Sequence, residues 1–233
     1  MTDTMPKAMV PVNGKPLIQI LIERLQLSGV NEIVVNVHHF ADQIIDFVES
    51  KDRFGIDIRF SDERDMLLET GGGLKKAIPL FSNDKPIIVH NVDILSDADI
   101  RALYDEASLL IKSSEDTIGA VMLTSWRETQ RYLLFDDDNN LVGWINIATG
   151  QVKSPYKNLD VSRYHKYAYS GIQVFNPKIY TYMEDWKGKF SIIDFYLSVC
   201  DKVHIKCRPA SDLKLLDVGK LDTIAKAESF LIT

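Results

Sequence analysis

Cysteine is scarce in this sequence, which has only Cys200 and Cys207 among its 233 residues. Two cysteines cannot build a disulfide framework, and they lack the companion cysteines and histidines that a zinc site needs at its usual spacing. We therefore interpret both as reduced thiols on adjacent elements of the fold.

Long apolar runs are also missing, because no stretch approaches the roughly 20 consecutive apolar residues of a membrane span. The N-terminus lacks the basic and then apolar pattern of a secretory signal. We expect a cytoplasmic protein without a membrane partner. Basic residues are not in excess either, since 27 Lys and Arg stand against 33 Asp and Glu, for a formal charge of -6. This balance argues against nucleic acid as a partner, although a local basic patch could hold a small anionic substrate.

The composition is that of an ordinary globular protein, with 45% hydrophobic and 26% charged residues, and we expect one domain over residues 1–233. Apolar runs predict strands at residues 33–37, 56–60, 86–93 and 117–124, with helices beginning at residues 17, 41, 74 and 97. This alternation predicts an α/β fold with a doubly wound, mostly parallel, Rossmann-like sheet and helices on both faces. Residues 132–145 interrupt the alternation and are typical of a small β-hairpin insertion.

Three glycines follow Glu69 and Thr70, between an expected strand and an expected helix. Glycine lets a ligand approach the backbone closely, and the amides that open the next helix would point at such a ligand. A plain tight turn explains the same residues equally well. The run is neither a dinucleotide-binding fingerprint nor a P-loop, because it lacks the required glycine spacing and the Gly-Lys-Ser/Thr ending.

Two aspartates, Asp93 and Asp217, each follow an apolar strand at its carboxyl end. Ligands of open α/β sheets bind at this edge, so the two carboxylates could share one Mg²⁺ ion that carries phosphates. The alternative for Asp93 is a helix cap, and Asp97 fits that role better.

Six motifs span nearly the whole chain in order: PKAMVPVNGKPLI, NVHHFADQI, ETGGGLKKAIPLF, HNVDILSDADI, YSGIQVFNP and LLDVGKLDTIAKAESFL. The set resembles the short bacterial sugar-1-phosphate nucleotidyltransferases, a family that includes N-acetylmuramate-1-phosphate uridylyltransferases and mannose-1-phosphate guanylyltransferases. The resemblance implies that a nucleoside triphosphate and a sugar 1-phosphate react to give a sugar nucleotide and pyrophosphate, with Mg²⁺ as cofactor. It further implies a product for cell-wall or surface polysaccharides, and it is compatible with a homo-oligomer.

The resemblance also implies roles for single residues. It assigns Mg²⁺ to Asp93 and Asp217, and catalysis to Asp93 and to Lys7, which would contact phosphate. It assigns base contact to the backbone of Glu69, Thr70, Gly71 and Gly72, and sugar contact to Asn91, Tyr169, Ser170 and Gly171. By its position alone, Lys7 would be a solvated surface lysine.

The family begins with a buried strand and a glycine-rich loop of the form G-x-G-T-R-L-x-P-L-T, followed by D-x-x-P-K. In this sequence, the first residues that match the family pattern are Thr2 to Lys7. We therefore expect a fold that is N-terminally truncated relative to the family, without the natural first strand and with two unpaired strand edges in the middle of the sheet. We also expect little or no nucleotidyl transfer from these 233 residues. The alternative to an enzyme is a catalytically silent domain that binds sugar phosphate or nucleotide weakly.

Overall fold

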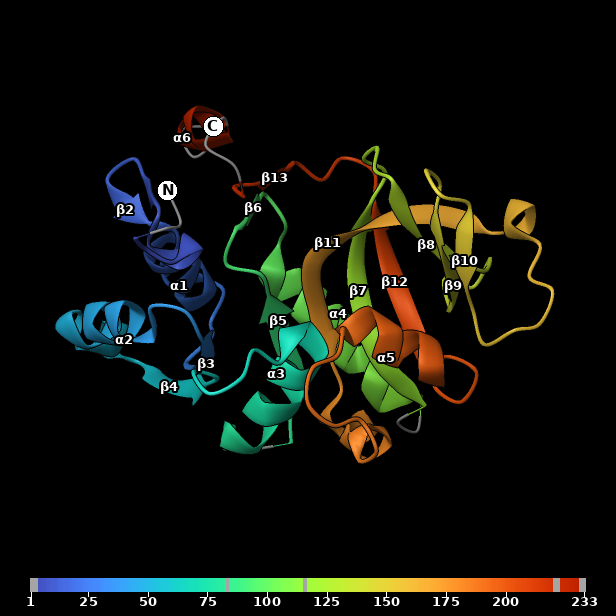
Figure 1. The fold of residues 1–233 in the computed structure, drawn as a ribbon, viewed down its shortest axis with the longest axis horizontal. Helices are drawn as coiled ribbons and strands as arrows, with labels where there is room; N and C mark the ends of the chain where they lie inside the picture. The colour runs from blue at the N-terminus through green and yellow to red at the C-terminus, as the bar shows by residue number, and fades with distance from the viewer. Residues whose placement is uncertain (1–3, 83, 115–116, 220–222, 231–233) are drawn as a thin grey trace.

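The structure, a computed structural model, describes residues 4–82, 84–114, 117–219 and 223–230 (Figure 1). In the first half of the chain, helices alternate with strands, which confirms the alternation predicted from the sequence. The elements are η1 (Lys7–Met9), β1 (Pro11–Val12), β2 (Lys15–Pro16), α1 (Leu17–Leu27), β3 (Glu32–Val37), α2 (Ala41–Ser50), β4 (Asp57–Asp62), α3 (Glu69–Ala77), β5 (Ile87–His90), β6 (Ile94–Ser96) and α4 (Ile100–Ser113).

The second half contains most of the strands. They are β7 (Ile118–Ser125), β8 (Arg131–Phe135), β9 (Leu141–Asn146), β10 (Gln151–Lys153), β11 (His165–Phe175), β12 (His204–Ala210) and β13 (Leu215–Asp217), with α5 (Ile192–Val199) and α6 (Ile224–Phe230). Strands β8 and β9 pair antiparallel, which confirms the predicted hairpin. Cys200 and Cys207 are free and buried, and burial raises the pKa of each thiol to about 12.

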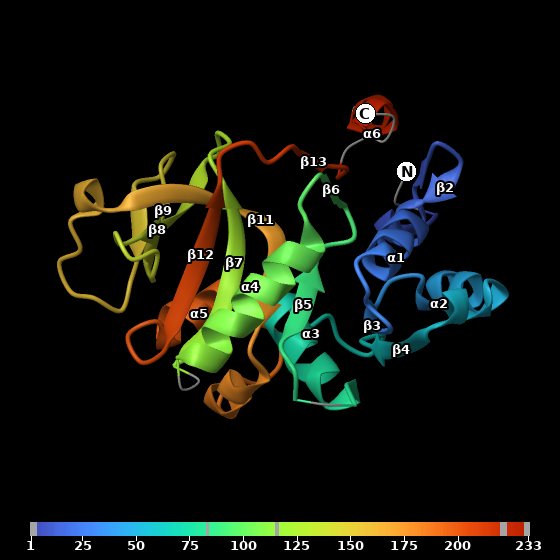
Figure 2. The same ribbon diagram turned by 180° about the vertical axis from the view of Figure 1, so that it is seen from behind.

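A seven-stranded sheet has the order β10, β9, β8, β11, β7, β12, and β5 also pairs with β11. Alternate residues of β7 point to opposite faces, because side chains along a strand alternate. Ala120 and Met122 pack in the same core as helix α5, whereas Val121 and Leu123 pack in the core that includes α4. Helices α4 and α5 therefore cover opposite faces of the sheet, as Figures 1 and 2 show.

The sheet is more mixed than the mostly parallel one that the sequence pattern predicts. Among the strands in the described part of the chain, β3 with β4 and β7 with β12 are the parallel pairs. The difference arises at β11, which lies antiparallel to β5, β7 and β8. A long strand that returns from a hairpin insertion meets its neighbours in the opposite direction, and the alternation of elements in the first half gives no sign of this.

The sheet is interrupted between β3 and β5. Within the described residues, β3 pairs with β4 alone, β5 pairs with β11 alone, and the two pairs belong to separate sheets. A cavity of 820 Å³ lies between them. The prediction of two unpaired strand edges in the middle of the sheet is confirmed for the residues that the structure describes.

The end of the described chain returns to its beginning. Strand β13 pairs antiparallel with β6, and Asn13 Nδ2 donates a hydrogen bond of 3.1 Å to the carbonyl oxygen of Glu228 in α6. Figure 1 accordingly shows α6 near β2. None of the helices in the described ranges is long and apolar enough to cross a membrane.

Candidate functional site

Three charged side chains from distant parts of the sequence lie together beyond the end of β5. Lys7 has its Nζ atom 3.4 Å from Oδ2 of Asp93. A Cβ atom placed on Gly219 would lie 2.8 Å from Oδ1 of Asp217 and 3.4 Å from Nζ of Lys7, so both charged groups border this glycine. The structure thus brings together the residues to which the resemblance assigns phosphate and Mg²⁺.

Backbone hydrogen bonds fix the two aspartates relative to each other. In the pairing of β13 with β6, Asp217 lies opposite Ile94, the residue after Asp93. The amide of Val218 then donates a hydrogen bond of 2.8 Å to the carbonyl oxygen of Asp93. The two carboxylates therefore belong to one rigid pair of short strands, although their residues are far apart in the sequence.

Asp97 does not cap helix α4, and this corrects the role considered for it from the sequence. The N-cap is Asp99, whose Oδ1 accepts a hydrogen bond of 2.8 Å from the amide of Ala102. Asp97 instead accepts a hydrogen bond of 3.0 Å from the amide of Lys214. That bond anchors the start of β13, and so Asp97 supports the strand that carries Asp217.

The surroundings of Asp93 and Asp217 suit a hard divalent cation. The side chain of Asp93 is 23% exposed and Asp217 is exposed, so solvent reaches both carboxylates. Mg²⁺ prefers oxygen ligands and usually takes only one or two carboxylates, with substrate phosphates and water completing its shell. Groups of three or more His, Cys, Asp or Glu side chains that could hold a metal are absent from the described residues. The two aspartates therefore fit a cation shared with substrate better than a closed protein cage.

Asn91 and Gly171 form a second part of the site. The amide of Asn91 donates a hydrogen bond of 3.0 Å to the carbonyl oxygen of Gly171. Gly171 has a φ angle of +81°, and a Cβ atom there would lie 2.9 Å from Nδ2 of Asn91. Glycine alone adopts this angle without strain and leaves room for the amide side chain. The exposed residue Asn91 is thus held beside the buried backbone of Gly171.

The two residues before Gly171 have different surroundings. The hydroxyl of Ser170 donates a hydrogen bond of 2.6 Å to the carbonyl oxygen of Leu123 and accepts one of 3.2 Å from the amide of Ile172. Tyr169 lines the cavity between β3 and β5, and burial raises the pKa of its hydroxyl. Ser170 therefore supports the irregular part of β11, and Tyr169 faces the cavity.

The glycine run lies inside helix α3, which corrects its sequence interpretation as a loop between a strand and a helix. The amides of Gly71 and Gly72 donate to the carbonyl oxygen of Phe190, at 2.9 and 3.3 Å. A Cβ on Gly72 would lie 2.5 Å from the carbonyl oxygen of Gly188. These glycines are needed because the helix packs directly against another backbone segment, and two of the amides expected to face a ligand already have a partner.

Thr70 and Asn91 both border the cavity, which reaches from the start of α3 to the end of β5. The Oγ1 atom of Thr70 accepts a hydrogen bond of 3.0 Å from the amide of Ile192. Glu69 pairs with Lys189, with 3.2 Å between Oε1 and Nζ, and has a positive φ angle of 60°. The start of α3 is therefore held in place by the segment that leads into α5.

No pattern in the sequence singles out Gly219, Asn36 or Glu63 as residues near the site. Glu63 is 1% exposed, its Oε2 accepts a hydrogen bond of 2.9 Å from the amide of Leu68, and its buried Oε1 has no partner in the described structure. A Cβ on Gly73 would lie 2.7 Å from both Oε1 of Glu63 and Nδ2 of Asn36. Glu63 stands in the polar run SDERD, which has the composition of a solvated loop, so the sequence contains no signal of its burial.

The arrangement combines functions that a reaction on phosphates requires. An ammonium group and two carboxylates can hold phosphate and a cation, and they lie next to polar groups that can orient a neutral ligand. Cys200 and Cys207 do not suit the role of a nucleophile, because both are buried and burial raises the pKa of each thiol.

A family model described as nucleotidyl transferase matches residues 1–233. An N-acetylmuramate alpha-1-phosphate uridylyltransferase of Neisseria meningitidis is 40% identical over 110 residues, which cover 47% of this chain and 47% of the relative. The enzyme of the same name from Caulobacter vibrioides is 42% identical over 95 residues, 40% of this chain and 39% of the relative. The matched segments thus span less than half the length of these two relatives.

Among solved structures, that of HddC from Yersinia pseudotuberculosis complexed with GMP-PN shares the fold, with a TM-score of 0.69 and 24% identity. The superposition covers 97% of this chain and 90% of that one. The match of the family model over the whole sequence, together with the shared fold, shows that this chain belongs to the nucleotidyl transferase family.

Proposed function

We propose that this protein transfers a nucleotide from a nucleoside triphosphate to a sugar 1-phosphate, with release of pyrophosphate. The observation that carries the proposal is the convergence of Lys7, Asp93 and Asp217 around Gly219. Lys7 and Asp93 are 86 residues apart in sequence, so local structure alone does not explain their contact. Membership of the family and the names of the two uridylyltransferase relatives support the same reaction.

This reaction requires that the two substrates be aligned and that the negative charge of their phosphates be neutralised. A phosphate oxygen of the sugar attacks the α-phosphorus while pyrophosphate leaves, so most of the catalytic effect comes from positioning and electrostatics. Asp93 and Asp217 would hold Mg²⁺, which supplies positive charge to the phosphates when it is bound. The ammonium group of Lys7, next to Asp93, would donate hydrogen bonds to phosphate oxygens. The amide side chain of the exposed residue Asn91, which lies beside Gly171, would orient the sugar.

In this proposal, residues at the start of α3 recognise the base of the nucleotide. The amides of Gly71 and Gly72 are already used by Phe190, which leaves the backbone of Glu69 and Thr70 to meet a base. Thr70 also borders the cavity that Asn91 borders, so one ligand could reach both residues. The relatives' names make UTP and N-acetylmuramate 1-phosphate the first substrate pair to test. In this proposal the protein acts in the cytoplasm and makes a precursor of the cell envelope.

A second candidate is a domain that binds nucleotide or sugar phosphate without turnover. The observation that favours it is the interrupted sheet, since the cavity between β3 and β5 reaches Thr70 at the start of α3 and Asn91 directly after β5, and no described strand joins β3 to β5. Catalysis is sensitive to small displacements of the positioning groups, whereas binding tolerates them better.

The test measures pyrophosphate release and binding side by side. The protein is assayed with each common nucleoside triphosphate against glucose, mannose, N-acetylglucosamine and N-acetylmuramate 1-phosphates, with Mg²⁺ or EDTA, and binding is followed by calorimetry. For an enzyme we expect Mg²⁺-dependent turnover that falls by roughly 10² to 10³ in Lys7→Met, since that variant loses one charge-stabilising donor. Lys15→Met is the control, because Lys15 is exposed and pairs with Glu23.

Each result has one reading. Turnover that requires both Mg²⁺ and Lys7 supports the transferase. Saturable binding of nucleotide that Lys7→Met weakens, without turnover, supports the second candidate. Neither turnover nor binding, or equal effects of the Lys7 and Lys15 variants, overturns both.

A further inference from the structure

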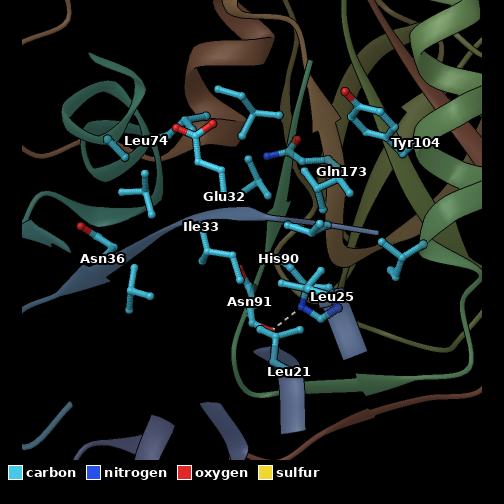
Figure 3. A pocket seen from close by; sticks show the side chains of 18 of the residues that line it. Leu21, Leu25, Glu32, Ile33, Asn36, Leu74, His90, Asn91, Tyr104 and Gln173 are labelled. Atoms are coloured by element: carbon cyan, nitrogen blue, oxygen red, sulfur yellow. Dashed lines mark hydrogen bonds between the residues drawn. The ribbon is translucent and has the colours of Figure 1, made fainter. Parts of the chain in front are cut away.

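The segment that follows β7 lies at the same edge of the sheet as Asn91. Strands β5 and β7 both run antiparallel to β11, so they point in one direction and their carboxyl ends meet at one edge. Asn91 follows His90 at the end of β5, and both border the cavity (Figure 3). Trp126 and Arg127 follow β7 at this edge. Because ligands of α/β sheets bind beyond the carboxyl ends of strands, both segments lie on the ligand-binding side.

Arg127 is tied to the stretch of β11 that contains Gly171. Its Nη2 donates a hydrogen bond of 3.2 Å to the carbonyl oxygen of Tyr169, two residues before Gly171. Two residues of a strand span about 7 Å, so this guanidinium lies within reach of a substituent on a sugar held at Gly171. A guanidinium has several N–H donors, and this bond occupies a single one of them.

A second arginine, Arg131, lies on the other side of the same stretch of β11. Strand β7 occupies one edge of β11, so β8 and β5 share the other edge. Leu133 of β8 is the partner of Tyr167, and so Arg131, two residues earlier, lies level with Tyr169. The start of β8 and the end of β5 therefore face each other along β11, with Arg131 at one end of the gap and Asn91 at the other.

The guanidinium groups of Arg127 and Arg131 have no ion-pair partner among the carboxylates that the structure describes. Other exposed arginines have one, since Arg53, Arg64 and Arg101 each pair with an aspartate or glutamate. Carboxylates are not scarce in a chain with 33 Asp and Glu against 27 Lys and Arg. Two positive charges on either side of one strand repel each other, and an anionic ligand between them would remove that repulsion.

Trp126 adds an apolar surface next to these charges. The residue is 63% exposed, and its ring lies parallel to that of Tyr167, with 6.3 Å between the ring centroids and 4° between the planes. His165 stacks on Tyr167 in turn, with 5.9 Å between the centroids. A large and rigid aromatic side chain offers contact area at a low cost in conformational entropy. Trp126 is therefore suited to cover the apolar face of a sugar ring.

We propose that Arg127, Arg131 and Trp126 select a sugar 1-phosphate that carries a carboxylate in addition to its phosphate. The carboxylate accepts hydrogen bonds from the two guanidinium groups, and Trp126 covers the ring or its apolar substituent. The inference rests on the proposed function, which places the phosphate at Lys7 and the ring at Asn91. A substituent on the side of the ring away from the phosphate then points along β11 toward the two arginines.

A carboxylate explains the two arginines better than the other groups of the substrates do. The phosphates already have Lys7 and the proposed cation site of Asp93 and Asp217. A neutral hydroxyl does not compensate the charge of a guanidinium, whereas a planar carboxylate matches its geometry and forms strong charge-assisted hydrogen bonds.

The experiment measures binding by isothermal titration calorimetry in the presence of Mg²⁺. It uses two matched pairs of sugar phosphates: glucuronate and glucose 1-phosphate, and N-acetylmuramate and N-acetylglucosamine 1-phosphate. Within each pair, the first sugar has a carboxylate that the second lacks. We expect the acidic sugar of at least one pair to bind about tenfold or more tightly than its neutral partner, because the added contact is between opposite charges.

The protein variants separate the charge from the apolar surface. Arg127→Gln and Arg131→Gln should each weaken binding of the acidic sugar about tenfold and leave the neutral sugar unchanged. Arg163→Gln is the control, because Arg163 is exposed and ends the 3₁₀ helix Val161–Arg163 before β11. Trp126→Ala should weaken both members of a pair alike, and Tyr182→Ala, which changes another exposed aromatic residue, should weaken neither. The melting temperature of each variant checks that it is folded.

A preference for the acidic sugar that is lost in Arg127→Gln and kept in Arg163→Gln supports the proposal. No preference in either pair, or equal effects of the Arg127 and Arg163 variants, overturns it. If Arg127→Gln weakens acidic and neutral sugars equally, the arginine holds the phosphate, which also overturns it. Failure of the proposed function is a separate result, because these titrations need no turnover. Turnover of neutral sugars without a preference would support the transferase and overturn this proposal alone.

Discussion

The amide of Val218 donates a hydrogen bond of 2.8 Å to the carbonyl oxygen of Asp93. This bond joins the end of the chain to the turn after β5, and it sets Asp217 beside Asp93 without any contact between the two side chains being needed. Two carboxylates held close to each other repel, and a divalent cation removes that repulsion. This is the arrangement on which the proposed Mg²⁺ site depends.

The first prediction follows from that pair. In the presence of a nucleoside triphosphate, Asp93→Asn and Asp217→Asn should each lower the affinity for Mg²⁺ by about tenfold or more, since a hydrogen bond or contact with a charged group contributes roughly 1.5 to 3 kcal/mol. Isothermal titration calorimetry with Mg²⁺ measures the affinity, and turnover should fall in parallel. Asp97→Asn is the control, because asparagine can still accept the hydrogen bond from the amide of Lys214. Wild-type affinity in either site variant would rule out the shared cation.

Gly219 provides a second, independent test of the same site. A Cβ atom at this position would lie 2.8 Å from Oδ1 of Asp217, closer than real Cβ contacts, so Gly219→Ala should push the carboxylate away. Gly219 is exposed, and we expect the melting temperature to change little while the Mg²⁺ affinity falls severalfold. The two quantities are measured on the same preparation. If the variant loses stability but keeps its Mg²⁺ affinity, Gly219 is needed for the backbone conformation and not for the Mg²⁺ site.

The cap of helix α4 allows a prediction about stability alone. Asp99→Ala removes the acceptor for the amide of Ala102 and should lower the free energy of unfolding by roughly 0.5 to 2 kcal/mol, with little effect on ligand binding. Urea denaturation followed by circular dichroism measures the change. Asp97→Ala should act differently, because it frees the start of β13 and so weakens Mg²⁺ binding. Identical behaviour of the two alanine variants would contradict the assignment of the cap.

The spacing of apolar residues in the sequence predicted much of this fold, because the buried face of each helix or strand requires apolar residues at that spacing. The first helix and the strand after it follow from apolar residues such as Leu17, Ile18 and Ile22, whose spacing matches the buried face of α1. The same pattern could not show that β11 runs antiparallel to its neighbours, since direction depends on the connection and not on which residues are apolar.

The candidate site was predictable only in part, and for a different reason. Strand ends pointed to Asp93 and Asp217, but nothing local distinguishes Lys7 from any solvated lysine, and its role came from the resemblance to a family. The glycine run was predicted as a loop because glycine disfavours helices, yet α3 includes Gly71 and Gly72 because their backbone lies against residues 188–190. That constraint comes from tertiary packing with a segment more than 100 residues away, which no local window contains.

The last prediction concerns His90 and the dependence of stability on pH. Burial lowers the pKa of His90 from 6.5 to about 4, and the positive charge of Arg24 acts in the same direction, whereas the hydrogen bond to Asn91 opposes it. The folded state thus keeps the ring neutral while the unfolded chain takes up a proton below about pH 6.5. As the pH falls from 6.5 to 4, the unfolded state binds more protons, so the free energy of unfolding decreases, by up to about 3 kcal/mol from this group, and the effect levels off below pH 4. In His90→Gln this part of the decrease should disappear, while the exposed His39→Gln should keep it. Urea unfolding at pH 7, 6, 5 and 4 gives the slope for each protein, and equal slopes in the wild type and His90→Gln would show that the ring is charged in the folded protein.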